Sequence, residues 1–296
     1  MTWFDTYTHR AFAEAGMVGL LAGVVGVQVV LRRLAFYAMA MTHATFPGVV
    51  LASMLGVDIY LGGTVAGVLL SLVIVALTRR PGRTASGAIG VVLAAGFALG
   101  AALITAGPAG DRKLSAFLVG SIVTIDTHDL AVTAATGTTI LLLIALSARE
   151  LTFAAFDHEG MRAAGYRVVA WDLLLLLIVQ AVIVVLTPAV GIMLTLALLV
   201  APAATARLWT DSLSRTTVLA GVLGVASAMG GLELSRHYDV AAGATIALVA
   251  AAGFGCSLLV SPRHGALGRL LGRVLDRRPD ADADADAAAP PVVPVG

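Results

Sequence analysis

Residues 168–206 read VVAWDLLLLLIVQAVIVVLTPAVGIMLTLALLVAPAATA, and Asp172 is the only charged residue among them. A helix needs about 20 mostly apolar residues to cross the roughly 30 Å hydrocarbon core of a bilayer. The stretch is therefore long enough for two spanning helices, and Pro188 lies where we expect the turn between them. It predicts a protein that is embedded in a membrane.

The same apolar bias extends over the whole chain of 296 residues, of which 59% are hydrophobic and 12% are charged. Soluble domains carry about 25% charged residues. The low share of charged residues makes membrane lipid the expected surrounding. The net charge of +1 gives no reason to expect a nucleic-acid partner. A single cysteine, Cys256, excludes an intramolecular disulfide and a thiolate metal cage. The composition predicts an all-α, polytopic transmembrane helix bundle.

Charge-free intervals elsewhere predict seven more spans, which makes about nine. They lie near 15–31 and in the intervals 33–58, 58–79, 83–111, 129–149, 215–233 and 239–263. Leu114–Ile125 has only twelve uncharged residues, too few to cross, and is expected to be a re-entrant or interfacial piece.

Alternating the loops around these spans places fifteen of the 19 basic residues on one side. Cytoplasmic loops carry an excess of Lys and Arg. We therefore expect the N-terminus outside and the C-terminus in the cytoplasm. The domains are then an extracellular segment 1–14, a transmembrane domain 15–262 and a cytoplasmic tail 263–296. The tail is expected to be largely disordered, because alternating Asp and Ala cannot form a core.

His43 is the only histidine in the interior of a predicted span, where an ionisable residue is costly unless it pairs or lines a cavity. Met39 precedes it by four positions, on the same helix face. Pro47 follows by four positions and has no N–H, so the His43 carbonyl should lack its helical donor. Sulfur, nitrogen and oxygen in one place suit a borderline or soft divalent ion. From these residues alone, a kinked helix whose histidine bonds to a neighbouring helix is an equal alternative.

Residues 150–165, ELTFAAFDHEGMRAAG, are too polar to span but carry several apolar side chains. They predict a short amphipathic helix on the cytoplasmic face, ended by Gly165. Such a helix could dock into a partner subunit or could simply connect two spans. The residues alone leave both readings open.

Other polar or helix-bending residues give weaker signals. Two outer loops could receive a cation or could be ordinary solvated segments; their residues are Asp126, His128 and Asp129, and Glu233, His237 and Asp239. Pro202 frees the carbonyl of Leu198 and should kink the seventh span. Lys113 is the only lysine and does not follow a glycine, so the chain has no phosphate-binding G-x-x-x-x-G-K-[ST] loop. Any ATP hydrolysis must therefore take place on a separate polypeptide.

Several motifs resemble one known family in the same order along the chain. Residues 42–49, THATFPGV, resemble the S-H-A-x-x-P-G-V signature of permeases in manganese, zinc and iron ABC importers. Further similar stretches are AIG at 88–90, FALG at 97–100, GSI at 120–122, residues 156–165, VG at 190–191, ALL at 197–199, APAATA at 201–206 and GAT at 243–245. The likeness covers about residues 15–260.

The resemblance implies the permease subunit of an importer that moves a divalent transition-metal ion, manganese or zinc rather than iron. It implies a homodimer, two ATP-binding subunits, an extracellular metal-binding protein, no permanently bound cofactor and a bacterial cytoplasmic membrane. Residues 150–165 would be the coupling helix, with Asp157, Glu159 and Gly165 facing the ATPase, and His43 would be a pathway ligand. The family usually has an acidic residue where this chain has Met39. A thioether suits hard manganese poorly, so Met39 is either a different ligand or only narrows the passage.

The alternative function is a secondary metal transporter driven by an ion gradient. Such a transporter should show buried carboxylates within its spans. Asp172, near the cytoplasmic end of the sixth span, is the only candidate in the sequence.

Overall fold

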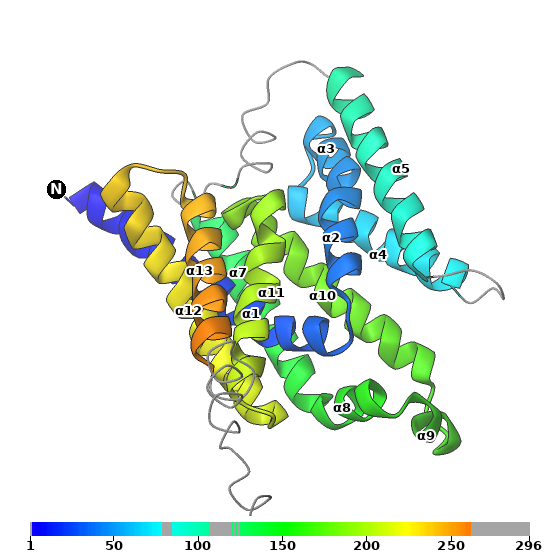
Figure 1. Ribbon diagram of the computed structural model, residues 1–296. Coiled ribbons are helices and arrows are strands. Elements are labelled where there is room, and N and C mark those ends of the chain that lie inside the picture. Colours follow the sequence, from blue (N-terminus) through cyan, green and yellow to red (C-terminus); the bar gives the residue numbers. More distant parts are fainter. Residues whose placement is uncertain (1, 79–84, 107–119, 121, 123–124, 262–296) are drawn as a thin grey trace, which may run out of the picture.

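The computed structural model describes residues 2–78, 85–106, 120, 122 and 125–261, and it is built from α-helices (Figure 1). The helices are α1 (Thr2–Leu31), α2 (Ala35–Ala44), α3 (Phe46–Met54), α4 (Ile59–Thr78), α5 (Ala85–Ala106), α7 (Thr127–Leu146), α8 (Ala148–Phe156), α9 (His158–Ala163), α10 (Val168–Val190), α11 (Ile192–Trp209), α12 (Leu213–Tyr238) and α13 (Ala242–Val260). No strand occurs in the described part of the chain.

Eight helical stretches in the described residues are long and apolar enough to cross a membrane. One of them, Ala35–Met54, consists of α2 and α3 together. The apolar part of α11, Leu194–Trp209, is shorter. These eight stretches and α11 correspond to the nine predicted spans, so the prediction of a polytopic helix bundle is confirmed.

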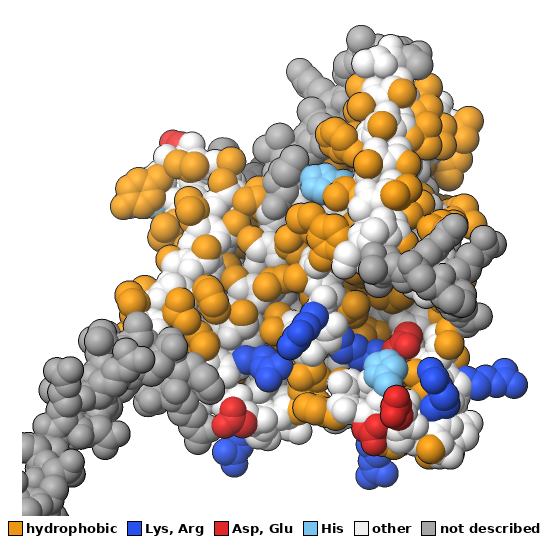
Figure 2. Space-filling view, turned by 45° about the vertical axis from the view of Figure 1, so that its right-hand side comes forward, with side chains coloured by type: hydrophobic (Ala, Val, Ile, Leu, Met, Phe, Trp, Pro, Cys, Tyr) orange, Lys and Arg blue, Asp and Glu red, His pale blue; other side chains and the backbone are white. Residues whose placement is uncertain are grey.

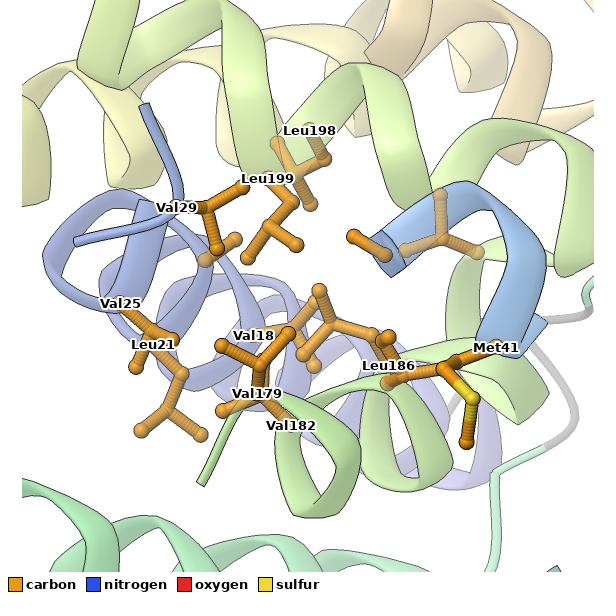
Figure 3. Close-up of a cluster of buried hydrophobic side chains, with 14 of the residues drawn as sticks. Val18, Leu21, Val25, Val29, Met41, Val179, Val182, Leu186, Leu198 and Leu199 are labelled. Carbon is orange, nitrogen blue, oxygen red and sulfur yellow. The ribbon is translucent and has the colours of Figure 1, made fainter. Parts of the chain in front are cut away.

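The core lies where α1, α10 and α11 meet (Figure 3). Val25 of α1, Val182 of α10 and Leu199 of α11 are all almost completely buried there. Among the membrane-crossing stretches, α10 has the largest buried share, 72%, which makes it the central helix. The outer helices α4, α5 and α13 keep many apolar side chains exposed, as lipid-facing helices do.

The helices α1 and α12 approach each other closely because small residues line their contact. A Cβ atom added at Gly19 would lie 2.5 Å from the carbonyl oxygen of Gly224, which leaves no room for any side chain. Close backbone approach through small residues is how membrane helices gain packing energy.

The turn between α10 and α11 lies at Gly191, not at Pro188 as the sequence predicts. Pro188 is inside the last turn of α10, which continues to Val190. Gly191 has φ +94°, a conformation that glycine adopts without steric cost. The chain therefore reverses three positions later, at the residue that can take a positive φ.

The first helix also differs from the prediction, since it extends well before Ala15. It begins at Thr2, and its membrane-crossing stretch is Thr8–Leu31. The predicted boundary depended on Glu14 being outside the span, but Glu14 is buried.

Charged side chains gather at the lower end of the face in Figure 2, and apolar side chains cover most of that face above them. The helices α8 and α9 lie at the same lower end in Figure 1, away from the start of α1. The predicted tail 263–296, and the predicted interfacial piece apart from Gly120, Ile122 and Ile125, lie outside the described residues.

Candidate functional site

Met39 and His43 lie on one face of α2, and both side chains are partly exposed. Their neighbours Ala40 and Ala44 are buried against the rest of the protein. The edge of one ring faces the other between His43 and Phe97 of α5, with 5.9 Å between the ring centroids and an interplanar angle of 84°. The structure thus places the imidazole and the thioether on one partly exposed face of α2, with Phe97 of α5 beside the imidazole.

The helix α5 reaches this position because Gly96 has no side chain. A Cβ atom at Gly96 would lie 2.7 Å from the Cα of Ala44. The contact brings Phe97 next to His43, and Gly100 similarly makes room for Phe46. Glycines in α5 therefore determine how closely this helix approaches His43.

The span that carries His43 is broken at Thr45, two residues after the histidine, between the end of α2 and the start of α3. Both the N–H and the hydroxyl of Thr45 donate to the carbonyl of Met41, at 3.2 Å and 2.8 Å. Pro47 lies in the first turn of α3, where its missing N–H costs nothing. The N–H of Thr45 is also directed at the carbonyl of His43, but it does not replace the helical donor that Pro47 lacks.

One copy of the chain does not contain a complete metal cage in its described residues. No group of three or more His, Cys, Asp or Glu residues in that part of the chain is placed to hold a metal ion. His43 and Met39 together offer one nitrogen and one sulfur. Such a pair can make a weak, transient contact with a soft or borderline cation.

The segment 150–165 forms two short helices, not the single helix that the sequence predicts. Helix α8 ends at Phe156, and Asp157 caps α9 by accepting a 2.7 Å hydrogen bond from the N–H of Gly160. Aspartate favours such a cap over a position inside a helix, which is the reason for the break. Gly165 ends α9 with φ +85°, as predicted for a C-terminal glycine. We call α8, Asp157 and α9 the coupling segment, after the role that the family resemblance leads us to expect.

The coupling segment has a buried face and an exposed apolar face. Leu151, Ala154 and Met161 are completely buried, and the last two pack with Val168. On the other side Phe156 is 72% exposed, and Phe153, Tyr166 and Glu159 are also exposed. Large exposed apolar groups beside charged ones are typical of a surface that binds another protein.

The loop before α7 forms a structural cap rather than an open set of ligands. Asp126 caps α7, and hydrogen bonds from the backbone and side chain of Thr127 lower the pKa of Asp126. Asp129 accepts a 3.0 Å bond from the hydroxyl of Tyr60 in α4, and His128 lies 3.7 Å from Asp58. These residues fasten α7 to the start of α4.

The remaining candidate residues also have structural roles. Glu233 pairs with Arg236 at 3.5 Å, and Asp239 ends α12 in a left-handed conformation with His237 two positions before it. Pro202 is buried within α11, which continues through it without interruption.

Two further polar residues are important, and sequence patterns do not reveal their surroundings. Glu14 is buried in α1 and accepts a 2.7 Å hydrogen bond from the hydroxyl of Thr133. Asp172, the predicted candidate for a buried carboxylate, instead forms an ion pair with Arg32 at 2.6 Å. Both partners are more than a hundred positions away along the chain, so no local signal identifies them.

Together, these features define a multi-pass helical membrane protein with a partly exposed His–Met pair and a short two-helix segment at the charged end of the bundle. The sequence profile of the ABC 3 transport family matches residues 5–261, and the chain belongs to this family. The prediction from the ordered motifs is thereby confirmed.

Relatives support the same assignment over nearly the whole chain. The manganese transport system membrane protein MntC of Halalkalibacterium halodurans is 37% identical, over 89% of this chain and 90% of that protein. The zinc transport system membrane protein TroC of Treponema pallidum is 32% identical, over 91% and 94%. The solved structure of PsaBC from Streptococcus pneumoniae in complex with Fab is similar with a TM-score of 0.80 and 32% identity, over 87% and 93%. Membership in an ABC family favours ATP-driven transport over the gradient-driven alternative.

Proposed function

We propose that this chain is the permease subunit of an ABC importer that carries a divalent transition-metal ion, manganese or zinc, into a bacterial cell. Iron is the less favoured cargo. The observation that carries the proposal is the shared, partly exposed face of Met39 and His43 beside the break at Thr45, in a chain similar to manganese and zinc transport proteins. The ion is the cargo, so it must be held briefly and then released.

A second copy of the chain would complete the passage. One copy supplies only two ligands at α2, and two copies around a two-fold axis would supply four. The described residues of one copy contain no group of three or more His, Cys, Asp or Glu that could hold a metal ion, so a second copy is the proposed source of further ligands. We therefore propose a homodimer with Met39 and His43 of each copy facing the passage, and with Pro47 and Pro202 shaping it.

The coupling segment is proposed to bind the ATP-binding subunit. Its exposed apolar face includes Phe156, and Asp157, Glu159 and Gly165 shape its turns and charge. An extracellular metal-binding protein would deliver the ion at the opposite end of the bundle. The assembly would lie in the cytoplasmic membrane, with the coupling segment in the cytoplasm.

Uptake by the reconstituted complex tests the proposal. The permease, its ATP-binding subunit and the extracellular metal-binding protein are placed together in vesicles. We expect labelled manganese or zinc to accumulate only with ATP and a loaded binding protein. Accumulation driven by a proton or sodium gradient without ATP would instead support the secondary transporter.

A further inference from the structure

Arg32, directly after the end of α1, makes two contacts with elements at the charged end of the protein. Its Nη1 lies 2.6 Å from Oδ1 of Asp172 in the second turn of α10, and its Nη2 donates a 3.2 Å bond to the carbonyl of Leu151 in α8. The Arg32 side chain is only 8% exposed. A guanidinium can bind two acceptors at once in fixed directions, which an ammonium cannot do.

The same carboxylate also contacts the second helix of the coupling segment. Nε2 of His158, the first residue of α9, lies 3.3 Å and 3.4 Å from the two oxygens of Asp172. Helix α8 is therefore held by Arg32, and α9 is held by the ion-pair partner of Arg32. We call Arg32, Asp172, the Leu151 carbonyl and His158 the latch.

The latch adjoins the helix that carries the metal ligands. Arg33 follows with φ +56°, a left-handed turn, and α2 begins at Ala35. His43 is eleven positions after Arg32, and most of the residues between them belong to α2. A helix is rigid, with a rise of about 1.5 Å per residue, so little flexible chain separates Arg32 from His43. Tyr37 in the first turn of α2 donates a 3.2 Å bond to the carbonyl of Leu176, one helical turn beyond Asp172. The start of α2 is thus fastened to the same part of α10 as the latch.

We infer that Arg32 is a positioning residue that transmits movement of the coupling segment to α2, and through α2 to Met39 and His43. This inference rests on the proposed function. Movement of α8 or α9 displaces the guanidinium or its carboxylate, and the short left-handed turn at Arg33 passes that displacement to α2. The ion pair thus lies between α8 and α9, which an ATPase would move, and α2, which carries the proposed metal ligands.

The test measures the number of metal ions imported per ATP hydrolysed by the reconstituted complex. Arg32→Gln and Asp172→Asn are each expected to lower this ratio at least about fivefold, the lower end of the usual size of a coupling effect. Because both act on one contact, the double variant should be no worse than either alone. Exchanging the charges, with Arg32→Asp and Asp172→Arg together, should recover part of the loss. Arg215→Gln is the matched control, since it removes the same charge from an exposed position in α12 that touches no part of the latch, and it should leave the ratio unchanged.

A purely structural role would lower the amount of assembled complex and not the ratio per ATP. The inference is overturned if Arg32→Gln keeps the wild-type ratio, if Arg215→Gln lowers the ratio equally, or if the two single losses add. Where Arg32→Gln yields no complex, Asp172→Asn decides in the same assay, because Asp172 is more exposed and its amide keeps the same shape. Failure of the wild-type complex to import metal with ATP would count against the proposed function. A normal wild type with an unimpaired Arg32→Gln variant counts against the latch alone.

Discussion

The hydroxyl of Thr133 in α7 donates a 2.7 Å hydrogen bond to Oε1 of Glu14 in α1, where Glu14 is only 1% exposed. Oε2 of the same carboxyl group is buried and has no hydrogen-bond partner among the described residues. A polar side chain within a span is costly unless a neighbour bonds to it, so this single bond should matter for stability.

Thr133→Val should therefore lower the free energy of unfolding by about 1 kcal/mol, because the valine removes the donor and keeps the volume. Glu14→Gln keeps an acceptor for Thr133 without adding charge, so it should be tolerated. Thermal unfolding in detergent measures both, with Thr138→Val as the control at an exposed position of the same helix. A normal unfolding temperature for Thr133→Val would show that the bond contributes little.

His43→Ala should lower metal uptake at least about tenfold, since even the loss of a group next to a metal ligand has an effect of this size. The expected loss is in transport and not in the amount of protein, because His43 is partly exposed and its ring contacts only one aromatic neighbour in the described structure. Uptake of labelled manganese and zinc at matched expression measures it. His9→Ala, at an exposed position of α1, is the control. Uptake at the wild-type rate in His43→Ala would remove the histidine from the pathway.

Met39 should influence which metal is carried, and two substitutions separate its two readings. If the sulfur is a ligand, Met39→Leu lowers zinc uptake, whereas a residue that only narrows the passage tolerates leucine. Met39→Asp provides a hard oxygen ligand and should raise manganese uptake relative to zinc. Competition between the two labelled ions gives the ratio. An unchanged ratio in Met39→Asp would place residue 39 outside the metal's path.

Phe156→Ser and Glu159→Arg should reduce the amount of ATP-binding subunit that copurifies with the permease. Phe156 is the large apolar group most exposed on the coupling segment, and central aromatic groups dominate binding at interfaces. Tyr238→Ser is the matched control, because Tyr238 is 68% exposed at the end of α12. Equal copurification of all three variants with the wild type would mean that the ATPase binds elsewhere.

The positions of charged residues predict most of the fold, because lipid tolerates few charges. The interval between Asp58 and Arg79 contains α4 as expected, and α7 begins two residues before the expected interval between Asp129 and Arg149. The prediction fails where one residue has a local alternative. The turn after α10 is at Gly191 and not at Pro188, because glycine adopts the positive φ that this turn requires. In the segment 150–165, Asp157 caps a new helix where one longer helix is expected.

The sequence predicts only the part of the candidate site that lies within a single helix. The four-residue spacing places Met39 and His43 on one face of α2 without knowledge of the fold. The pairing of Arg32 with Asp172 depends instead on how α1 and α10 pack, and 140 positions separate the two residues. Asp172 therefore looked like an unpaired carboxylate, and the buried Glu14 looked like a boundary residue.

The exposed aromatic side chains of Phe153 and Phe156 have a consequence for the cell. On a permease without its ATPase, these side chains would form an exposed apolar surface of the kind that chaperones and proteases recognise. A bound ATPase would cover that surface. Cells that make this permease in excess of its ATPase should therefore degrade the surplus, so the supply of the ATPase would limit how many working transporters a membrane contains.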